Sequence, residues 1–322
     1  MVSPQVLRVA SALLALVTSS IALGVAPGQI KNFVTFGDSY TDSSYYPSAD
    51  GGYQWPTWAA EYGPFNLYGL ARSGATCSNL LTYRPFPPIM EWQIPAYLNE
   101  TYNGTLALNP QETIYTIWIG TNDLGVSALL TGSDTPGVSI VPVRQCAVDV
   151  LKRLYESGAR NFIMQSIIPL DLTILYSSNS YPSRYWTAQR NTTEWSVFMR
   201  ELVRAGNQIT LLELEALAPT LPGAHIASFD SYGFFTDVYN HPGNYLNGTA
   251  PLNVTGCINS CVYALNESTS DPGDCTVAEG SAQDSFMWYD ELHFSQQTAR
   301  VLAREIATVM SGQFSPWATW LS

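Results

Sequence analysis

The sequence predicts an α/β fold in which helices cover both faces of a parallel sheet of about five strands. Two observations lead to this prediction: short apolar runs recur along the chain, and segments with helical spacing of apolar residues separate them. Strands that are apolar on both faces are typical of a parallel sheet buried between helices. The 322 residues are 46% hydrophobic, which is enough for a large core, so we expect a three-layer αβα sandwich.

Five apolar runs are the strand candidates, and glycine, proline or polar residues separate them from their neighbours. The expected strands are 33–36, 65–70 (the weakest of the set), 113–119, 161–168 and 225–229. Three longer segments repeat apolar residues every three to four positions and are expected to be helical: 143–157, 192–218 and 295–310. Gly158 ends the first of these helices, and Ser295 is the expected N-cap of the third.

The acidic charge balance argues against two classes of binding partner, nucleic acids and anionic membranes. The formal net charge is −12, with only 14 Lys and Arg residues. Because nucleic-acid binding depends on cationic contacts with phosphate, a nucleic-acid partner is not expected. An acidic surface also disfavours stable docking on anionic membranes, whereas neutral substrates such as sugars or simple esters remain possible.

The N-terminal segment is typical of a secretory signal peptide. Arg8 precedes an apolar run over residues 9–26, and small residues between 24 and 28 offer cleavage points. A membrane anchor is the alternative, but the run is of borderline length and contains serine and threonine, and no later segment is apolar for long enough to span a bilayer. We therefore expect residues 1–26 to be removed and the protein to be extracellular.

Secretion would explain two further features of the sequence, its glycosylation sequons and its cysteines. Six N-x-[ST] glycosylation sequons occur, at Asn99, Asn103, Asn191, Asn247, Asn253 and Asn266, and we expect several of them to carry glycans. The five cysteines are Cys77, Cys146, Cys257, Cys261 and Cys275. In an oxidising compartment we expect one disulfide between Cys77 and Cys146 and another between Cys275 and either Cys257 or Cys261, which leaves one free thiol. A zinc site is the alternative for the last three, but their segment has no histidine.

We find neither an internal repeat nor a linker, so residues 29–322 are expected to form a single domain. The segment 244–285 is rich in glycine, asparagine and cysteine. It is interpreted as a surface insertion held by a disulfide. A monomer is the default expectation.

The stretch "NFVTFGDSYTDSSYYP" at residues 32–47 places Ser39 immediately after the first expected strand. Ser39 is either an ordinary turn residue or a nucleophile presented at a strand end. A serine nucleophile needs a base, and the chain has only three histidines: His225, His241 and His293. In "WYDELHFS", Asp290 precedes His293 by three residues, so a curled loop would let the carboxylate orient the imidazole. Alone, this pattern also fits a surface Asp and a half-buried His.

Two other polar segments follow expected strands. In "IWIGTNDLG", Asn122 can donate its side-chain amide to a developing oxyanion, or can simply form a turn. In "LARSGATCSN", Gly74 can offer an unshielded backbone N–H, although many such glycines only form turns. Because sites in open α/β sheets form beyond the carboxyl ends of strands, these loops are expected to converge with Ser39.

Taken together and in this order, "FGDSYTD", Gly74, "GTND" and "DELH" resemble the SGNH hydrolase superfamily, also called the GDSL esterases and lipases. The four motifs span residues 33–293. Tyr40 stands where the family name implies leucine, and this departure resembles the fungal secreted acetylesterases of carbohydrate esterase family sixteen. The stretch "HIASFDSYGFFTDVYNHPGNYLN" is similar to the segment before the catalytic Asp-x-x-His of fungal members.

The resemblance implies a flavodoxin-like parallel sheet and a role for each matching residue. Ser39 is the implied nucleophile, His293 the base and then the acid, and Asp290 the residue that orients His293. The backbone N–H groups of Ser39 and Gly74 and the side chain of Asn122 form the implied oxyanion hole. This mechanism needs no metal or cofactor. Asp38 is expected to have a structural role, bonding nearby backbone N–H groups.

The substrate is expected to be a small ester or an acetylated oligosaccharide. Three tryptophans near the motifs, Trp55, Trp58 and Trp288, are candidates to line the site and stack on sugar rings. No long apolar lid segment lies near Ser39, which favours a short acyl group. The expected function is therefore removal of O-acetyl groups from hemicellulose-derived xylo-oligosaccharides. The alternatives are a GDSL lipase, phospholipase or broad arylesterase, and an inactive carbohydrate-binding protein.

Overall fold

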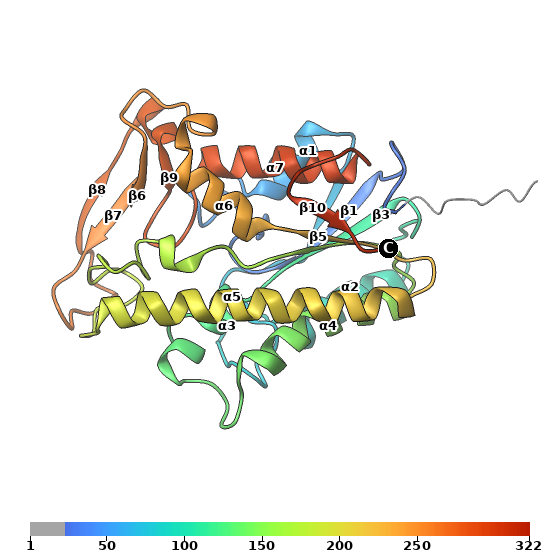
Figure 1. Ribbon diagram of the computed structural model, residues 1–322, viewed down its shortest axis with the longest axis horizontal. Helices are drawn as coiled ribbons and strands as arrows, with labels where there is room; N and C mark the ends of the chain where they lie inside the picture. The colour runs from blue at the N-terminus through green and yellow to red at the C-terminus, as the bar shows by residue number, and fades with distance from the viewer. Residues whose placement is uncertain (1–22) are drawn as a thin grey trace, which may run out of the picture.

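The computed structural model describes residues 23–322, and its centre is a six-stranded sheet between two layers of helices (Figure 1). The strand order is β10-β5-β4-β3-β1-β2, with β1 to β5 parallel and β10 antiparallel at the edge. The sheet strands are β1 (Asn32–Gly37), β2 (Asn66–Gly69), β3 (Thr113–Trp118), β4 (Asn161–Gln165), β5 (His225–Phe229) and β10 (Ala318–Trp320). The predicted α/β fold is confirmed, with one more strand than expected.

The central strands form because their residues suit burial on both faces. All six residues of β3 and all five of β4 are buried. Successive side chains of a strand point to opposite faces, so Phe33 of β1 joins one apolar core and Val34 joins the other. The sheet therefore separates two cores, and its carboxyl ends define a single rim.

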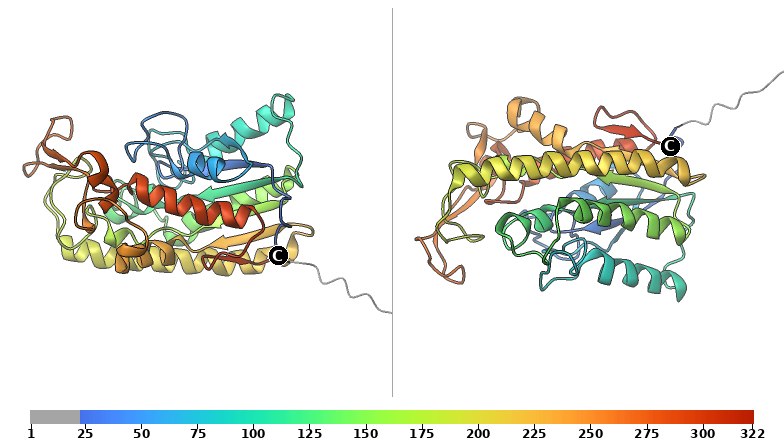
Figure 2. Two further views of the ribbon diagram at one scale, coloured as in Figure 1. Left: turned by 90° about the horizontal axis from the view of Figure 1, so that it is seen from above. Right: turned by 60° about the horizontal axis from the view of Figure 1, so that its bottom comes forward.

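Two helix pairs cover the two faces of the sheet, α1 with α7 on one side and α4 with α5 on the other (Figures 1 and 2). The α-helices are α1 (Trp55–Tyr62), α2 (Ile94–Tyr102), α3 (Thr121–Leu124), α4 (Ile140–Glu156), α5 (Thr192–Leu217), α6 (Ser231–Asn240) and α7 (Gln296–Met310), with a π-helical turn η1 (Ile89–Gln93) before α2. Short 3-10 segments lie at Leu129–Thr131, Leu170–Leu172, Ala218–Thr220, Pro242–Asn244 and Gly280–Ser285.

The helix boundaries follow capping chemistry. Ser295 accepts a hydrogen bond from the Thr298 N–H and is the N-cap of α7, as expected. The helix expected from residue 143 begins at Ile140 instead, because Ser139 caps it and the proline that follows is tolerated in a first turn. Asn191 caps α5 by accepting from the Glu194 N–H.

The cysteine-rich segment and the strand that follows it form two small strand pairs at one end of the molecule, opposite the C-terminus (Figures 1 and 2). The segment contains β6 (Asn253–Cys257), β7 (Asn259–Val262) and β8 (Asp274–Val277), and β9 (Phe286–Trp288) follows it directly. β6 pairs with β9, and β7 and β8 form a hairpin.

Two disulfides are present, Cys77–Cys146 and Cys261–Cys275. Of the two partners left open for Cys275, the structure pairs Cys261, and Cys257 is a buried thiol. Most of the expected signal peptide lies in residues 1–22, outside the described residues. Within residues 23–322, no helix is long and apolar enough to cross a membrane.

Candidate active site

Ser39 lies in a tight turn at the carboxyl end of β1, where neighbouring groups fix the end of the strand. Gly37 is the last residue of β1, and a Cβ there would come within 2.5 Å of the Trp118 carbonyl oxygen on β3. The buried Gln93 amide accepts from the Gly37 N–H (3.0 Å) and donates to the Gly37 carbonyl (2.8 Å). In the turn, Asp38 accepts from the Tyr40 N–H, the structural role expected for it. Ser39 is thereby held in a defined position.

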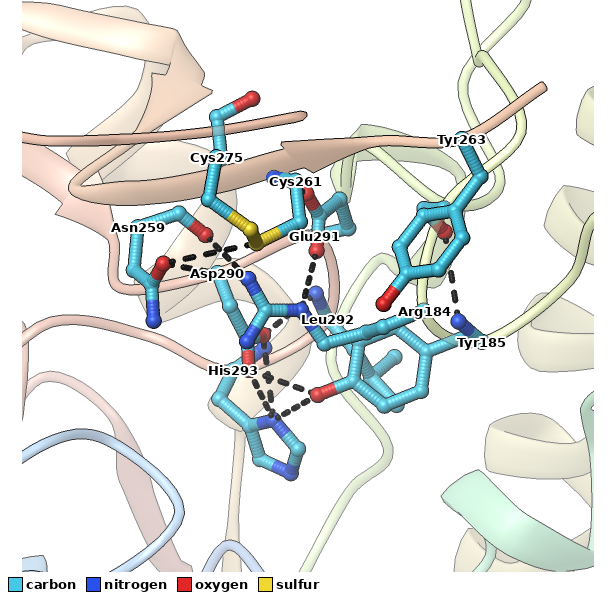
Figure 3. A network of polar contacts seen from close by, with 12 residues as sticks. Arg184, Tyr185, Asn259, Cys261, Tyr263, Cys275, Asp290, Glu291, Leu292 and His293 are labelled. Carbon is cyan, nitrogen blue, oxygen red and sulfur yellow. Dashed lines mark hydrogen bonds and ion pairs between the residues drawn. A yellow bond between two sulfur atoms is a disulfide. The ribbon is translucent and has the colours of Figure 1, made fainter. Parts of the chain in front are cut away.

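The structure brings Ser39, His293 and Asp290 together (Figure 3 shows the last two). The Ser39 Oγ lies 2.8 Å from His293 Nε2, and His293 Nδ1 lies 3.1 Å from both carboxylate oxygens of Asp290. Asp290 Oδ1 also accepts the backbone N–H groups of Leu292 and His293, at 2.8 and 2.7 Å. These bonds curl the loop by one turn, so that the Asp-x-x-His spacing places both side chains side by side.

Asp290 and His293 stabilise each other's charged forms although both are buried. Burial alone would raise the pKa of Asp290, but His293 and the hydrogen bonds to the carboxylate hold that pKa below its ordinary value. Burial alone would lower the pKa of His293, but the Asp290 charge raises it above the ordinary value. Asp290 is therefore ionised, and His293 is a stronger base than an isolated imidazole.

Two tyrosines that the sequence did not single out as site residues hold this loop. Tyr40 is buried, donates to the Leu292 carbonyl (2.9 Å) and packs edge-on against the His293 ring. Tyr185 donates to Asp290 Oδ2 (2.6 Å) and lies 3.0 Å from His293 Nδ1. Tyr40 had one sequence signal, because it replaces the leucine that the family name implies. Tyr185 had none, because it lies in an irregular segment outside the motifs.

Three hydrogen-bond donors border the space in front of Ser39. Among the hydrogen bonds of residues 23–322, none uses the backbone N–H of Ser39 or Gly74. Gly74 adopts φ +78°, and a Cβ there would overlap the Phe86 ring. The Asn122 amide donates to the Ala75 carbonyl (2.9 Å) and keeps its second N–H. Such a set of donors can stabilise an oxyanion.

Arg84 fixes which way the Asn122 amide faces. Its guanidinium donates to Asn122 Oδ1, so the amide nitrogen must lie on the other side, where the Ala75 carbonyl accepts from it. Arg84 also donates to the Val126 carbonyl and lines the cleft. Sequence reasoning missed Arg84, because it follows no strand and belongs to no motif.

Two acidic residues of the motifs, Asp42 and Asp123, connect the loops that carry Ser39, Gly74 and Asn122. Asp42 accepts from the N–H of Ser73, which precedes Gly74, at 2.7 Å. Asp123, next to Asn122, accepts from the Cys77 N–H at 3.0 Å. The polar residues beside the candidate site residues therefore hold the loops together.

The cleft is small, with a volume of about 280 Å³. It is lined by Ser39, Ala49, Ser73, Gly74, Arg84, Phe86, Thr121, Asn122, Val126, Tyr176, Tyr185, Leu292 and His293. A larger cavity of about 550 Å³ lies between α5 and strands β5 and β10, and its lining includes Arg204 and Trp317 but no histidine or cysteine among the residues described.

The structure does not bring the three candidate tryptophans to this cleft. Trp55 and Trp288 are fully buried, with their indole N–H groups bonded to Thr41 and Val254. Trp58 donates to the Tyr53 carbonyl and is partly buried against the apolar core that contains Trp55. These rings lie close to the motifs in sequence, but they pack in or against one of the two apolar cores instead.

Two further buried carboxyls lie near His293. Burial raises the pKa of Asp38 to about 7, and burial likewise raises the pKa of Asp50 to about 7. Asp50 is fully buried; its Oδ1 accepts from Ser48 and Gly52, while its Oδ2 has no partner among the described residues. Both carboxyls are therefore largely protonated below neutral pH.

The other two histidines lie elsewhere. His225 begins β5, and exposed His241 bonds Asp237 at 2.8 Å after α6. Neither lines the cleft. In the described part of the chain, no group of three or more His, Cys, Asp and Glu residues is arranged to hold a metal ion.

The chain is similar to known proteins over most of its length. Residues 33–306 match the family described as GDSL-like lipase/acylhydrolase. An acetylesterase of Hypocrea jecorina is 30% identical, over 90% of this chain and 91% of its own length. An acetylesterase of Thermothelomyces thermophilus is 23% identical, over 88% and 89% of the two chains. The crystal structure of an acetylxylan esterase from Geobacillus stearothermophilus is 13% identical, with a TM-score of 0.47, over 91% of this chain and 97% of that one.

Proposed function

The chain belongs to the GDSL-like lipase/acylhydrolase family and is a carboxylic ester hydrolase, and from this premise we propose that it acts through Ser39, His293 and Asp290. The observation that carries the proposal is the unbroken hydrogen-bonded series from Ser39 Oγ through His293 to Asp290. A serine hydroxyl is a weak nucleophile unless a base takes its proton, and His293 is 2.8 Å away.

In the first step, the Ser39 Oγ attacks the ester carbonyl carbon while its proton passes to His293 Nε2. The resulting oxyanion accepts from the N–H groups of Ser39 and Gly74 and from the free amide N–H of Asn122. Asp290 stabilises the imidazolium that forms. Collapse of the intermediate breaks the bond to the alcohol, which receives the proton from His293 and leaves an acyl-serine.

In the second step, water replaces the alcohol. His293 takes a proton from water, the hydroxide attacks the acyl-serine carbonyl, and the same donors hold the second oxyanion. Collapse returns the proton to Ser39 Oγ and releases the carboxylic acid, which ionises. Neither step takes a group from outside the chain other than substrate and water.

We propose that the preferred ester is an acetyl group on a neutral oligosaccharide such as acetylated xylo-oligosaccharide. Two observations support this. The cleft of about 280 Å³ has room for a short acyl group, and its rim carries exposed aromatic rings, Tyr45 and Phe86, against which a sugar ring can stack. The Tyr45 hydroxyl bonds Ser73, which lines the cleft, at 2.8 Å.

The same proposal includes secretion and glycosylation of a single domain, residues 29–322, with 244–285 as an insertion. Disulfides favour an oxidising compartment. Five sequons are exposed and are the proposed glycan sites: Asn99, Asn103, Asn191, Asn247 and Asn266. Asn253 is half-buried in β6, where its side chain accepts from Thr255 and Gly256, and we expect no glycan there.

The test measures acetate release from acetylated xylo-oligosaccharides, alongside hydrolysis of nitrophenyl esters from acetate to palmitate. Ser39→Ala should abolish both activities while the protein folds normally, because only the Oγ is lost. Ser133→Ala, at an exposed serine, is the matched control and should retain wild-type rates.

The outcomes separate the alternatives. Activity that falls steeply beyond the shortest esters, together with acetate release, supports the acetylesterase. Activity on long acyl chains without acetate release would indicate a lipase. Binding of acetylated sugar without turnover would indicate a carbohydrate-binding protein. Substantial turnover by Ser39→Ala would remove Ser39 from the role of nucleophile.

A further inference from the structure

We propose that Tyr185 is a positioning residue that acts together with Asp290 on the orientation, tautomer and basicity of His293; this inference rests on the proposed function of Ser39, His293 and Asp290. The Tyr185 ring lines the cleft, and its hydroxyl reaches the side of the imidazole opposite Ser39 (Figure 3). It lies 2.6 Å from Asp290 Oδ2 and 3.0 Å from His293 Nδ1. The three groups close a hydrogen-bonded triangle.

The direction of each bond in this triangle follows from the protonation states. Burial and the Asp290 charge hold the pKa of Tyr185 well above its ordinary value, so the hydroxyl keeps its single proton. Asp290 is ionised and can only accept, so that proton goes to Asp290 Oδ2. The Tyr185 oxygen therefore presents lone pairs to His293, and so do both carboxylate oxygens.

Nδ1 of His293 consequently faces three acceptor atoms and no donor. The neutral imidazole has one N–H, which must lie on Nδ1, and the Nε2 lone pair is left for the Ser39 proton. The hydrogen bond from Tyr185 also stabilises the Asp290 carboxylate, which limits how strongly that carboxylate raises the basicity of His293. Tyr185 thus affects both the geometry and the pKa of the base.

A second contact keeps Tyr185 in place. Its neighbour Arg184 pairs with Glu291, the neighbour of Asp290, at 3.1 Å. Glu291 is fully buried and also accepts from the backbone N–H of Cys261 (2.6 Å), a member of the Cys261–Cys275 disulfide (Figure 3). Arg184 and Tyr185 therefore bond Glu291 and Asp290, two consecutive residues of the loop. The disulfide-linked hairpin holds Glu291 through the Cys261 N–H.

The test is Tyr185→Phe, which removes one oxygen and keeps the ring. We expect kcat for nitrophenyl acetate to fall about tenfold, with KM within about twofold of wild type. Tyr185→Phe removes a donor to Asp290 (2.6 Å), which makes His293 more basic, and an acceptor facing Nδ1 (3.0 Å), which makes it less basic. Because the bond to the carboxylate is the shorter and is charge-assisted, its loss dominates, and the acid limb of the kcat/KM profile should move up by about half a pH unit. Tyr97→Phe is the matched control, since buried Tyr97 loses a comparable bond, to Tyr115 (2.7 Å), away from the cleft.

Unchanged kcat and an unmoved acid limb in Tyr185→Phe would overturn the inference, as would the same changes in Tyr97→Phe. NMR of the wild-type protein labelled with ¹⁵N-histidine tests the tautomer without a variant at Tyr185. The neutral form of His293 should carry its proton on Nδ1, and a proton on Nε2 would also overturn the inference. Ser39→Ala, assayed in parallel, shows separately whether the proposed function itself holds.

Discussion

Replacing Asp50 by Asn should make the protein more stable at pH 8 and leave its stability at pH 4 nearly unchanged. Asp50 is fully buried, and one of its carboxylate oxygens has no hydrogen-bond partner in the described chain. Burial therefore raises its pKa from 3.8 to about 7. Asparagine imitates the protonated carboxyl: its oxygen can accept the bonds from Ser48 and Gly52, and it never ionises.

The sign and size of this change in the free energy of unfolding follow from the linkage between proton binding and folding. A carboxyl whose pKa is raised on folding contributes stability below its unfolded pKa, and this contribution disappears as the pH rises through the folded pKa. A shift of about three units at about 1.4 kcal/mol each amounts to roughly 4 kcal/mol, of which about 3 kcal/mol is lost between pH 5 and pH 8. Asp50→Asn should not show this loss.

The assay is urea unfolding with the disulfides intact, at pH 4, 5 and 8, for wild type and Asp50→Asn. Asp38, which has a similarly raised pKa, is present in both proteins, so the difference between them isolates Asp50. Asp271→Asn, at an exposed carboxyl, controls for the loss of a charge and should parallel wild type. Parallel curves for wild type and Asp50→Asn between pH 5 and 8 would refute the reasoning.

Two further predictions concern the cleft. Asn122→Ala should lower kcat for nitrophenyl acetate by about 10²- to 10³-fold with little change in KM, because the amide acts on the oxyanion; a loss below about fivefold would argue against that role. His225→Gln and His241→Gln should keep wild-type kcat/KM, since neither residue lines the cleft, and a large loss in either variant would place the base elsewhere.

The sequence was sufficient to predict the sheet strands that are apolar on both faces and the loops that follow them. Runs such as that of β3 carry β-branched and aromatic residues with no polar face, so they can only be buried. The loops bearing Ser39, Gly74 and Asn122 then had to meet, because parallel strands end at one rim.

Other parts depend on contacts that leave no local pattern. β10 has three residues and is a strand only because β5 offers it a free edge. Tyr185 lies in an irregular segment, and nothing in its neighbourhood indicates a bond to a residue 105 positions away. Trp55 and Trp288 were expected at the cleft because they are close in sequence to motif residues, but the direction of each side chain, set by α1 and β9, points it into the core.

Ser39 and His293, the proposed nucleophile and base, stand 254 residues apart, one after the first strand and the other just before the last helix. A growing chain therefore exposes Ser39 long before His293 has been synthesised. Until α7 packs against α1 and the loop before α7 reaches the rim, Ser39 lacks His293, its proposed proton acceptor. In the proposed mechanism, an unfinished chain therefore lacks the base for ester cleavage, and activity requires that the two ends of the fold have met.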